Sequence, residues 1–443
     1  MTMHPFQTVM SRLKQRIAQD RLLSNIGWYS LAEGSARVSR IFATIFLARY
    51  LSAAELGIAA VAITCFEIVR TFANNGIGPM VIKARATALD ATCNTAFRLG
   101  WYFCIAMAIC QCAAGFVIFM TTGQAEIFPL VACLAAVFLI MPFGLINVYL
   151  LMRAGNIRCV AQIATAQMVA DNVLTAILAI AGFGPWAIVL PKVLTAPIWL
   201  YGVRRGKIWD ANPAAGNVPV ADFVKFSAPL LGSEILTAAR LQLDKVMVGS
   251  LLGLEALGVY YFVFNAGIGF SLSLTMALTN SIYPELVRFA GTPYRLLKRY
   301  KRALATTVAP ISAVIALQAL ATMLYVPIVF GAKWTAIAPL VGVLCASAIT
   351  KPFYDSAVQL LRAAGATRYE FAASSILTTI SLGSLAAGLH YDLWHGVAAL
   401  SASLFIVQFA LAVWARKVVA GSASRRKLKQ SNDFAPAEGL AAA

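Results

Sequence analysis

Charged side chains lie inside segments of this sequence that are otherwise apolar over membrane-spanning lengths. Acids and bases recur there three or four residues apart, as at Glu33, Arg37 and Arg40, and at Glu67 and Arg70. Residues with this spacing share one face of a helix, so each base has an acid within reach. A charge at the centre of a bilayer costs roughly 2.5–3.5 kcal/mol. We therefore expect these side chains to face one another or a watery cavity, where ions can be bound and exchanged.

The cations of this set are the predicted substrate-binding residues, and the acids are their predicted ion-pairing or ion-coupling partners. Lys192 and Asp171 are expected to pair with each other, and with them the set has seven cations and six acids. This small excess of cations indicates an anionic cargo. The alternative is that the pairs only fix helix packing. The other cations are Arg37, Arg40, Arg70, Arg240, Lys245 and Lys351, and the other acids are Glu33, Glu67, Glu234, Asp244 and Asp355.

The composition is that of a polytopic membrane protein. Of 443 residues, 60% are hydrophobic and 12% are charged, whereas soluble domains average about 25% charged residues. The net charge of +18 does not indicate nucleic-acid binding, because the bases lie in short loops between apolar segments. The eight cysteines form no CxxC motif and none has a histidine at ligand spacing. We therefore predict no metal, no cofactor and no catalytic residue.

The apolar segments predict an all-α fold of twelve transmembrane helices, since a span needs about 20 apolar residues. Of the 36 Lys and Arg residues, 27 fall on one side of this topology and two on the other. The positive-inside rule then places both termini in the cytoplasm. The short outer loops leave no room for an outer catalytic domain, so a membrane polymerase or ligase is disfavoured. The expected spans are 25–49, 56–82, 98–120, 127–151, 159–182, 185–203, 223–252, 256–283, 303–327, 337–361, 369–389 and 396–415.

The two halves of the chain resemble each other. Residues 47–58 match 248–259 at an offset of 201, which aligns Gly57 with Gly258. At an offset of 210, LLMRAGNIR (150–158) matches LLRAAGATR (360–368). Six spans in each half predict two six-helix bundles related by a pseudo-two-fold axis along the membrane normal, around a central cationic cavity.

The expected domains follow from this duplication. Residues 1–24 are a cytoplasmic basic amphipathic segment, 25–203 and 223–420 the two bundles, 204–222 a cytoplasmic linker, and 421–443 a disordered tail. We expect the first segment to lie on the anionic inner leaflet.

Two stretches resemble a known family. LARYLSAAELGI (47–58) is followed by Gly76 and Lys83, and VPIVFGAKWTAIAPLVGVLCA (326–346) contains Phe330, Gly331, Trp334 and Pro339. In these stretches the chain resembles the Wzx-type polysaccharide flippases of the multidrug/oligosaccharidyl-lipid/polysaccharide exporter superfamily. Many relatives have Pro where this chain has Ala53-Ala54.

The resemblance implies a transporter, not an enzyme. It implies that undecaprenyl-pyrophosphate-linked oligosaccharide is flipped across the bacterial inner membrane by alternating access, for exopolysaccharide or lipopolysaccharide synthesis. A polysaccharide polymerase and a chain-length regulator are the implied protein partners. Arginine suits this cargo because its planar guanidinium binds phosphate oxygens in pairs. The alternatives are the lipid II flippase and the multidrug cation exporters of the same superfamily.

Overall fold

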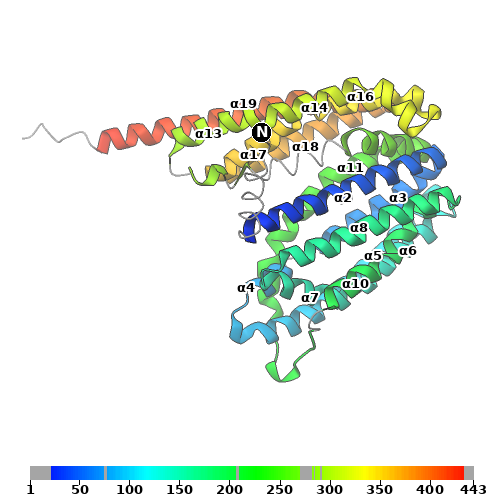
Figure 1. The fold of residues 1–443 in the computed structure, drawn as a ribbon, viewed down its shortest axis with the longest axis horizontal. Coiled ribbons are helices and arrows are strands. Elements are labelled where there is room, and N and C mark those ends of the chain that lie inside the picture. The colour runs from blue at the N-terminus through cyan, green and yellow to red at the C-terminus, as the bar shows by residue number, and fades with distance from the viewer. Residues whose placement is uncertain are drawn as a thin grey trace, which may run out of the picture. The chain divides into compact units, whose positions relative to one another are not determined.

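The computed structural model describes residues 21–73, 77–205, 209–269, 282–283, 285–289 and 292–433. Every regular element within these ranges is a helix (Figure 1). The chain forms two compact units. The first comprises Met1–Gly249 with Gly253–Gly258, and the second comprises Ser250–Leu252 with Val259–Ala443.

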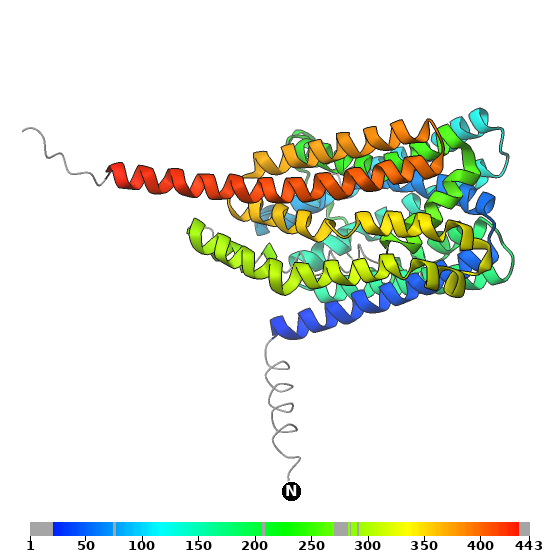
Figure 2. The same cartoon turned by 90° about the horizontal axis from the view of Figure 1, so that it is seen from above.

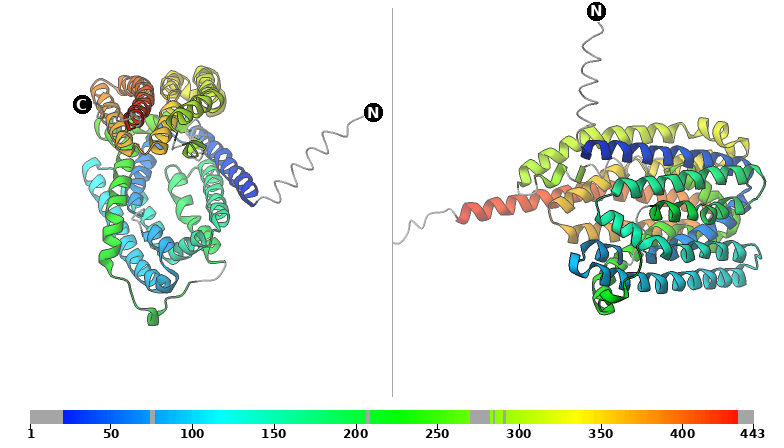
Figure 3. Two further views of the ribbon diagram at one scale, coloured as in Figure 1. Left: turned by 90° about the vertical axis from the view of Figure 1, so that its left-hand side faces the viewer. Right: turned by 60° about the horizontal axis from the view of Figure 1, so that its bottom comes forward.

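The first unit packs around α6, whose Leu130, Leu134 and Phe138 are fully buried in a core that includes α3 residues. Helix α2 lies beside α8 along much of its length (Figures 1 and 3). The helices are α2 (Arg21–Tyr50), α3 (Ala53–Arg70), η1 (Thr71–Ala73), α4 (Ile77–Lys83), η2 (Ala86–Ala88), α5 (Leu89–Thr122), α6 (Ile127–Ile140), α7 (Pro142–Arg153), α8 (Ile157–Ile180), α9 (Trp186–Leu194), α10 (Ala196–Arg204), η3 (Pro213–Ala215) and α11 (Val220–Ala266), which continues into the second unit.

The second unit packs around α19, which lies beside α18 (Figure 2) and also contacts α17 and α16. Its core includes Leu360 and Leu361 of α17 and Ala415 of α19. The helices are α13 (Pro293–Ala303), η4 (Leu304–Val308), α14 (Ala309–Leu320), α15 (Thr322–Tyr325), η5 (Val326–Phe330), η6 (Ala332–Ile337), α16 (Ala338–Ser347), α17 (Lys351–Ala363), α18 (Thr367–Leu389) and α19 (Leu393–Asp433).

Within the described ranges, nine helical segments are long and apolar enough to cross a membrane. The count is ten when α6 and α7, bent by 51° at Met141, form one span. Twelve were expected. Helix α2 is not among the ten because charges interrupt its apolar run. The expected spans 223–252 and 256–283 appear as one helix that breaks at Gly253, and the second of them passes out of the described residues.

The repeated sequence around Gly155 and Gly365 folds into the same turn in both places. After α7, the N–H of Gly155 donates to Met152 O and that of Asn156 to Leu151 O. After α17, the N–H of Gly365 donates to Arg362 O and that of Ala366 to Leu361 O. Both are Schellman helix ends, which need a left-handed residue, and both glycines have positive φ (77° and 72°). Two turns with matching bonds, 210 residues apart, support the internal duplication.

The linker predicted at 204–222 is bound to the first unit. Buried Asn94 of α5 donates to the carbonyls of Asn212 and Gly216, and Thr95 exchanges hydrogen bonds with the backbone of Val218. Phe223 at the start of α11 enters a core of α4, α5 and α7 residues. This anchoring explains why the first unit continues through Gly249 and does not end at residue 203.

The two ends of the chain are described only in part. The expected amphipathic segment 1–24 lies outside the described residues up to Asp20. Helix α19 runs on to Asp433, ten residues short of the chain end, and the predicted disordered tail at 421–443 stays a prediction. Six consecutive residues of this stretch, 425–430 (RRKLKQ), are good helix formers and extend a helix that is already nucleated.

Candidate functional site

A pocket of about 500 Å³, with four charged side chains in a largely apolar wall, opens inside the first unit. Helices α3, α6, α8, α9 and α10 contribute to its wall, and three interruptions of helical structure meet there. These are η1 after α3, the bend at Met141 between α6 and α7, and Thr195 between α9 and α10. In membrane transporters, discontinuous helices form the sites for substrates and coupling ions. Irregular backbone is tolerated at membrane depth where it lines such a cavity.

The interruption at Thr195 follows from local sequence. Pro191 lies inside α9 and Pro197 at the start of α10, and each removes a backbone donor. The carbonyl of Pro191 accepts from both the N–H (2.9 Å) and the hydroxyl (2.7 Å) of Thr195 at the end of α9. This break places Lys192 on the wall of the pocket, in the last turn of α9.

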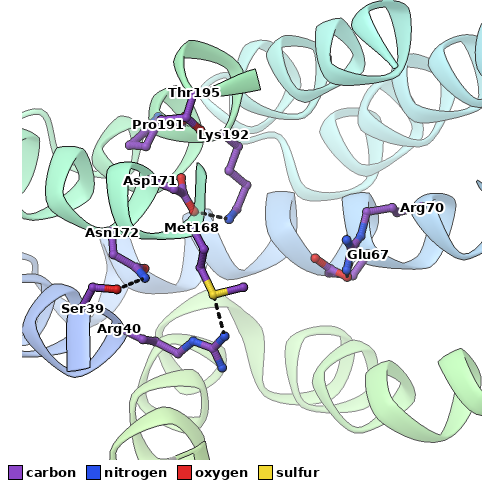
Figure 4. Close-up of polar contacts among 10 residues, drawn as sticks. All are labelled: Ser39, Arg40, Glu67, Arg70, Met168, Asp171, Asn172, Pro191, Lys192 and Thr195. Carbon is purple, nitrogen blue, oxygen red and sulfur yellow. Dashed lines mark hydrogen bonds and ion pairs between the residues drawn. The ribbon is translucent and has the colours of Figure 1, made fainter. Parts of the chain in front are cut away.

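Lys192 pairs with Asp171 of α8 across the pocket (Figure 4). The distance from Lys192 Nζ to Asp171 Oδ2 is 3.2 Å, and the side chains are 27% and 18% exposed. The pair predicted from the sequence is therefore confirmed. Asp171 Oδ1 is buried and has no hydrogen-bond partner among the described residues. A buried carboxylate oxygen in this state has unused capacity to accept a proton, a cation or a donor group.

Arg70 and Glu67 form the second ion pair of the pocket, on the last turns of α3. Arg70 donates through Nε (3.1 Å) and Nη2 (2.7 Å) to Glu67 Oε2. The Arg70 side chain is 55% exposed and Glu67 28%. The predicted pairing is confirmed, and its exposure leaves the Arg70 guanidinium accessible to a ligand in the pocket.

Arg40 of α2 reaches the edge of the same region (Figure 4). Its Nη2 lies 3.4 Å from the Sδ atom of Met168, a residue of the pocket wall. A thioether sulfur is a weak acceptor, so this contact leaves most of the donor capacity of Arg40 unused. Beside it, Asn172 donates to the Ser39 hydroxyl at 2.9 Å and ties α8 to α2.

The remaining predicted pairs are separate from this pocket. Asp244 and Lys245 are adjacent, both less than 10% exposed, and paired at 3.2 Å, while Lys245 Nζ also donates to Leu241 O. In the second unit, Lys351 pairs with Asp355 at 2.9 Å, as the i, i+4 spacing predicted. The i, i+4 spacing of Arg240 and Asp244 also allows a pair, which stays a prediction because the side chain of Arg240 lies outside the described residues.

Four predicted residues have little structural description. The side chains of Glu33, Glu234 and Arg240 lie outside the described part of the chain, and Arg37 is half-buried on α2. The sequence analysis missed the contributions of Met168, Thr195 and the helix breaks. Pro142, Pro191 and Pro197 were the available signal, since proline inside an apolar run ends or bends a helix.

The architecture defines a class of protein. The described chain is a multi-pass bundle of apolar helices with a charged pocket between interrupted helices, which is the organisation of a membrane transporter. Residues 46–339 match the model of a family described as "Polysaccharide biosynthesis protein". The chain belongs to this family.

Two curated relatives agree with this assignment. The lipopolysaccharide biosynthesis protein WzxC of Escherichia coli (strain K12) is 21% identical over 74% of this chain and 67% of its own length. The succinoglycan biosynthesis transport protein ExoT of Rhizobium meliloti (strain 1021) is 23% identical over 73% of this chain and 65% of its own length. The chain thus spans about two thirds of each relative.

Solved structures share the fold. The lipid II flippase MurJ in an inward closed conformation superposes with a TM-score of 0.68 at 14% identity, over 88% of this chain and 87% of that one. An inward-facing multidrug transporter of the MATE family superposes with a TM-score of 0.66 at 15% identity, over 87% and 95%. These relatives are transporters and flippases, not enzymes.

Proposed function

We propose that the protein moves an undecaprenyl-pyrophosphate-linked oligosaccharide from the inner to the outer leaflet of the bacterial inner membrane. The observation that supports this most directly is the meeting of three interrupted helices at a pocket that contains Arg70 and Lys192. The pocket offers the cargo two cations that are already partnered by carboxylates. Both termini lie in the cytoplasm in this proposal, as the loop charges predict.

Ion exchange is the proposed mode of binding. Before the cargo binds, Glu67 pairs with Arg70 and Asp171 pairs with Lys192. These carboxylates reduce the free-energy cost of holding cations inside the membrane. Pyrophosphate oxygens replace these carboxylates when the cargo enters, and Arg70 binds them through two N–H groups. Arg40, whose described partner is only a thioether, adds a third cation at the edge of the pocket.

Alternating access between two halves is the proposed mechanism of transport, and the repeated turns at Gly155 and Gly365 support the duplication that it requires. The cations outside this pocket, among them Lys245 and Lys351, are proposed to meet the cargo later in the cycle. Their acids, Asp244 and Asp355, hold them until then.

The test is a gene deletion followed by complementation. Polyprenyl-linked sugars are extracted, identified by mass, and assigned to a leaflet with a non-permeant probe. We expect a pyrophosphoryl-linked oligosaccharide to accumulate on the inner leaflet of the deletion strain. Hypersensitivity to cationic drugs without such accumulation would contradict the proposal and indicate a multidrug exporter.

Pocket variants then test the site itself. Arg70→Ala and Lys192→Ala are expected to leave the cargo on the inner leaflet, whereas Arg70→Lys retains part of the export because charge remains without the forked geometry. Arg98→Ala is the matched control, since Arg98 is an exposed cation of the same unit outside the pocket. Normal export by both pocket variants, at normal protein levels, would exclude this pocket as the binding site.

A further inference from the structure

Helix α13 of the second unit has one face fixed in the core. Leu296, Tyr300 and Ala303 are at most 5% exposed and belong to the cluster that includes residues of α17 and α19. The Tyr300 hydroxyl lies 3.4 Å from Ser356 Oγ of α17. The orientation of α13 about its own axis is therefore set by packing.

The opposite face of α13 carries only cations and a tyrosine. Arg295, Lys298, Lys301 and Arg302 are all exposed. Tyr294 is 69% exposed at the same end of the helix. The structure gives none of these four cations an acidic partner among the described residues. Arg299, on the flank of this face, does have one, because it pairs with Glu285.

This arrangement is unfavourable unless an anion is present. Arg295 and Lys298 are three residues apart, and Lys298 and Arg302 are four apart, so the charges are neighbours on the helix surface. Like charges at this spacing destabilise a helix, and each pair adds to the effect. The positive-inside rule explains why bases lie in this loop. It does not explain why they share one face of an ordered helix.

We propose that this basic face of α13, defined by Arg295, Lys298, Lys301 and Arg302, binds the anionic phospholipid headgroups of the inner leaflet. Helix α13 leads directly into the apolar span that ends at Leu320, and the loop charges place its start in the cytoplasm. Clusters of four or more bases at this position bind anionic lipids. An exposed tyrosine next to them suits the interfacial layer. Because packing already fixes the helix, binding orders no further backbone.

The experiment uses the full-length protein in detergent and measures the midpoint of thermal unfolding during titration with phosphatidylglycerol. Two double variants remove the same charge, Lys298→Gln/Lys301→Gln on α13 and Arg85→Gln/Arg98→Gln elsewhere. Each cation near an anionic surface changes affinity about fivefold. We therefore expect the half-saturating lipid concentration to rise about 25-fold for the α13 variant and less than about twofold for the control. Added salt should reduce the difference.

Two further arms determine the ligand. Titration with phosphatidylcholine should give no saturable rise in the wild-type protein, and Arg295→Lys/Arg302→Lys should behave as wild type because it keeps the charge. Equal effects of the two double variants, or an equal response to phosphatidylcholine, would overturn the proposal. A response to polyprenyl pyrophosphate without one to phosphatidylglycerol would also overturn it and identify the face as a docking site for transport substrate.

Discussion

Gly57 of α3 and Gly258 of α11 pack against each other in a reciprocal contact within the first unit. A Cβ atom on Gly57 would overlap the carbonyl oxygen of Leu254, and one on Gly258 would overlap that of Ala53. The same offset of 201 residues relates Gly57 to Gly258 and Ala53 to Leu254. The contact is therefore made twice by equivalent residues, which is the property of a local two-fold relation. The contact lies within the repeated segments 47–58 and 248–259.

Substitution of either glycine is expected to destabilise the protein. In Gly57→Ala or Gly258→Ala the new methyl group meets backbone, which cannot move aside as a side chain can, and overpacking of this kind costs about 1–3 kcal/mol. The measurement is the midpoint of thermal unfolding in detergent. Gly383→Ala is the control, since a Cβ there has no neighbour within 4 Å. An unchanged midpoint in both contact variants would contradict the close approach.

The two helix-ending glycines, Gly155 and Gly365, should respond alike to substitution. Gly155→Ala and Gly365→Ala force alanine into a left-handed conformation (φ 77° and 72°), which costs roughly 1–2 kcal/mol. Gly155→Asn and Gly365→Asn should lose less, because asparagine adopts this conformation more readily. Thermal unfolding of the four variants tests this. A Cβ at either glycine has no neighbour within 4 Å, so equal losses for Ala and Asn would contradict the role of the left-handed conformation.

Asp171 and Lys192 should be energetically coupled. Each single variant, Asp171→Asn or Lys192→Met, leaves a partly buried charge without its partner and is expected to cost about 1–3 kcal/mol. The double variant should cost less than the sum of the two, because no unpaired charge remains. A double-mutant cycle of unfolding midpoints measures the coupling. Additive losses would mean that the 3.2 Å contact contributes no net stability.

Release of the linker is expected from Asn94→Ala. Asn94 donates to two linker carbonyls and accepts from the N–H of Asn212, so its loss removes three of the bonds that hold residues 212–216. Limited proteolysis should then cleave this segment several times faster. Thr121→Ala is the control, because Thr121 is exposed and bonds only to the preceding turn of its own helix. Equal cleavage of the two variants would indicate that other contacts hold the linker.

The ion pairs that the sequence predicted correctly lie within one helix, except for Asp171–Lys192, which joins α8 to α9. Glu67–Arg70 and Lys351–Asp355 follow from spacing within one helix. Asp244 also pairs with its sequence neighbour Lys245, whose side chain reaches the Leu241 carbonyl as well, and helix spacing did not predict this contact. Spacing along a helix identifies possible partners but does not rank them.

The pocket could not be predicted from the sequence, because its position depends on where three separate helices break. Prolines marked two of the breaks, but nothing in a single sequence shows that the breaks at Met141 and Thr195 line one cavity. The structure gives the residues of the family motifs a packing role. Ala48 and Leu51 are 1% exposed at the turn into α3, and Phe330 and Trp334 both pack on the ring of Phe262.

The turns at Gly155 and Gly365 have the same backbone geometry although their sequences differ. Five of nine aligned residues remain identical there, and the backbone bonds correspond one for one. Mutation has altered the side chains while the geometry of the helix end has persisted. A chimera in which 360–368 replaces 150–158 is therefore expected to preserve the course of the backbone from α7 into α8.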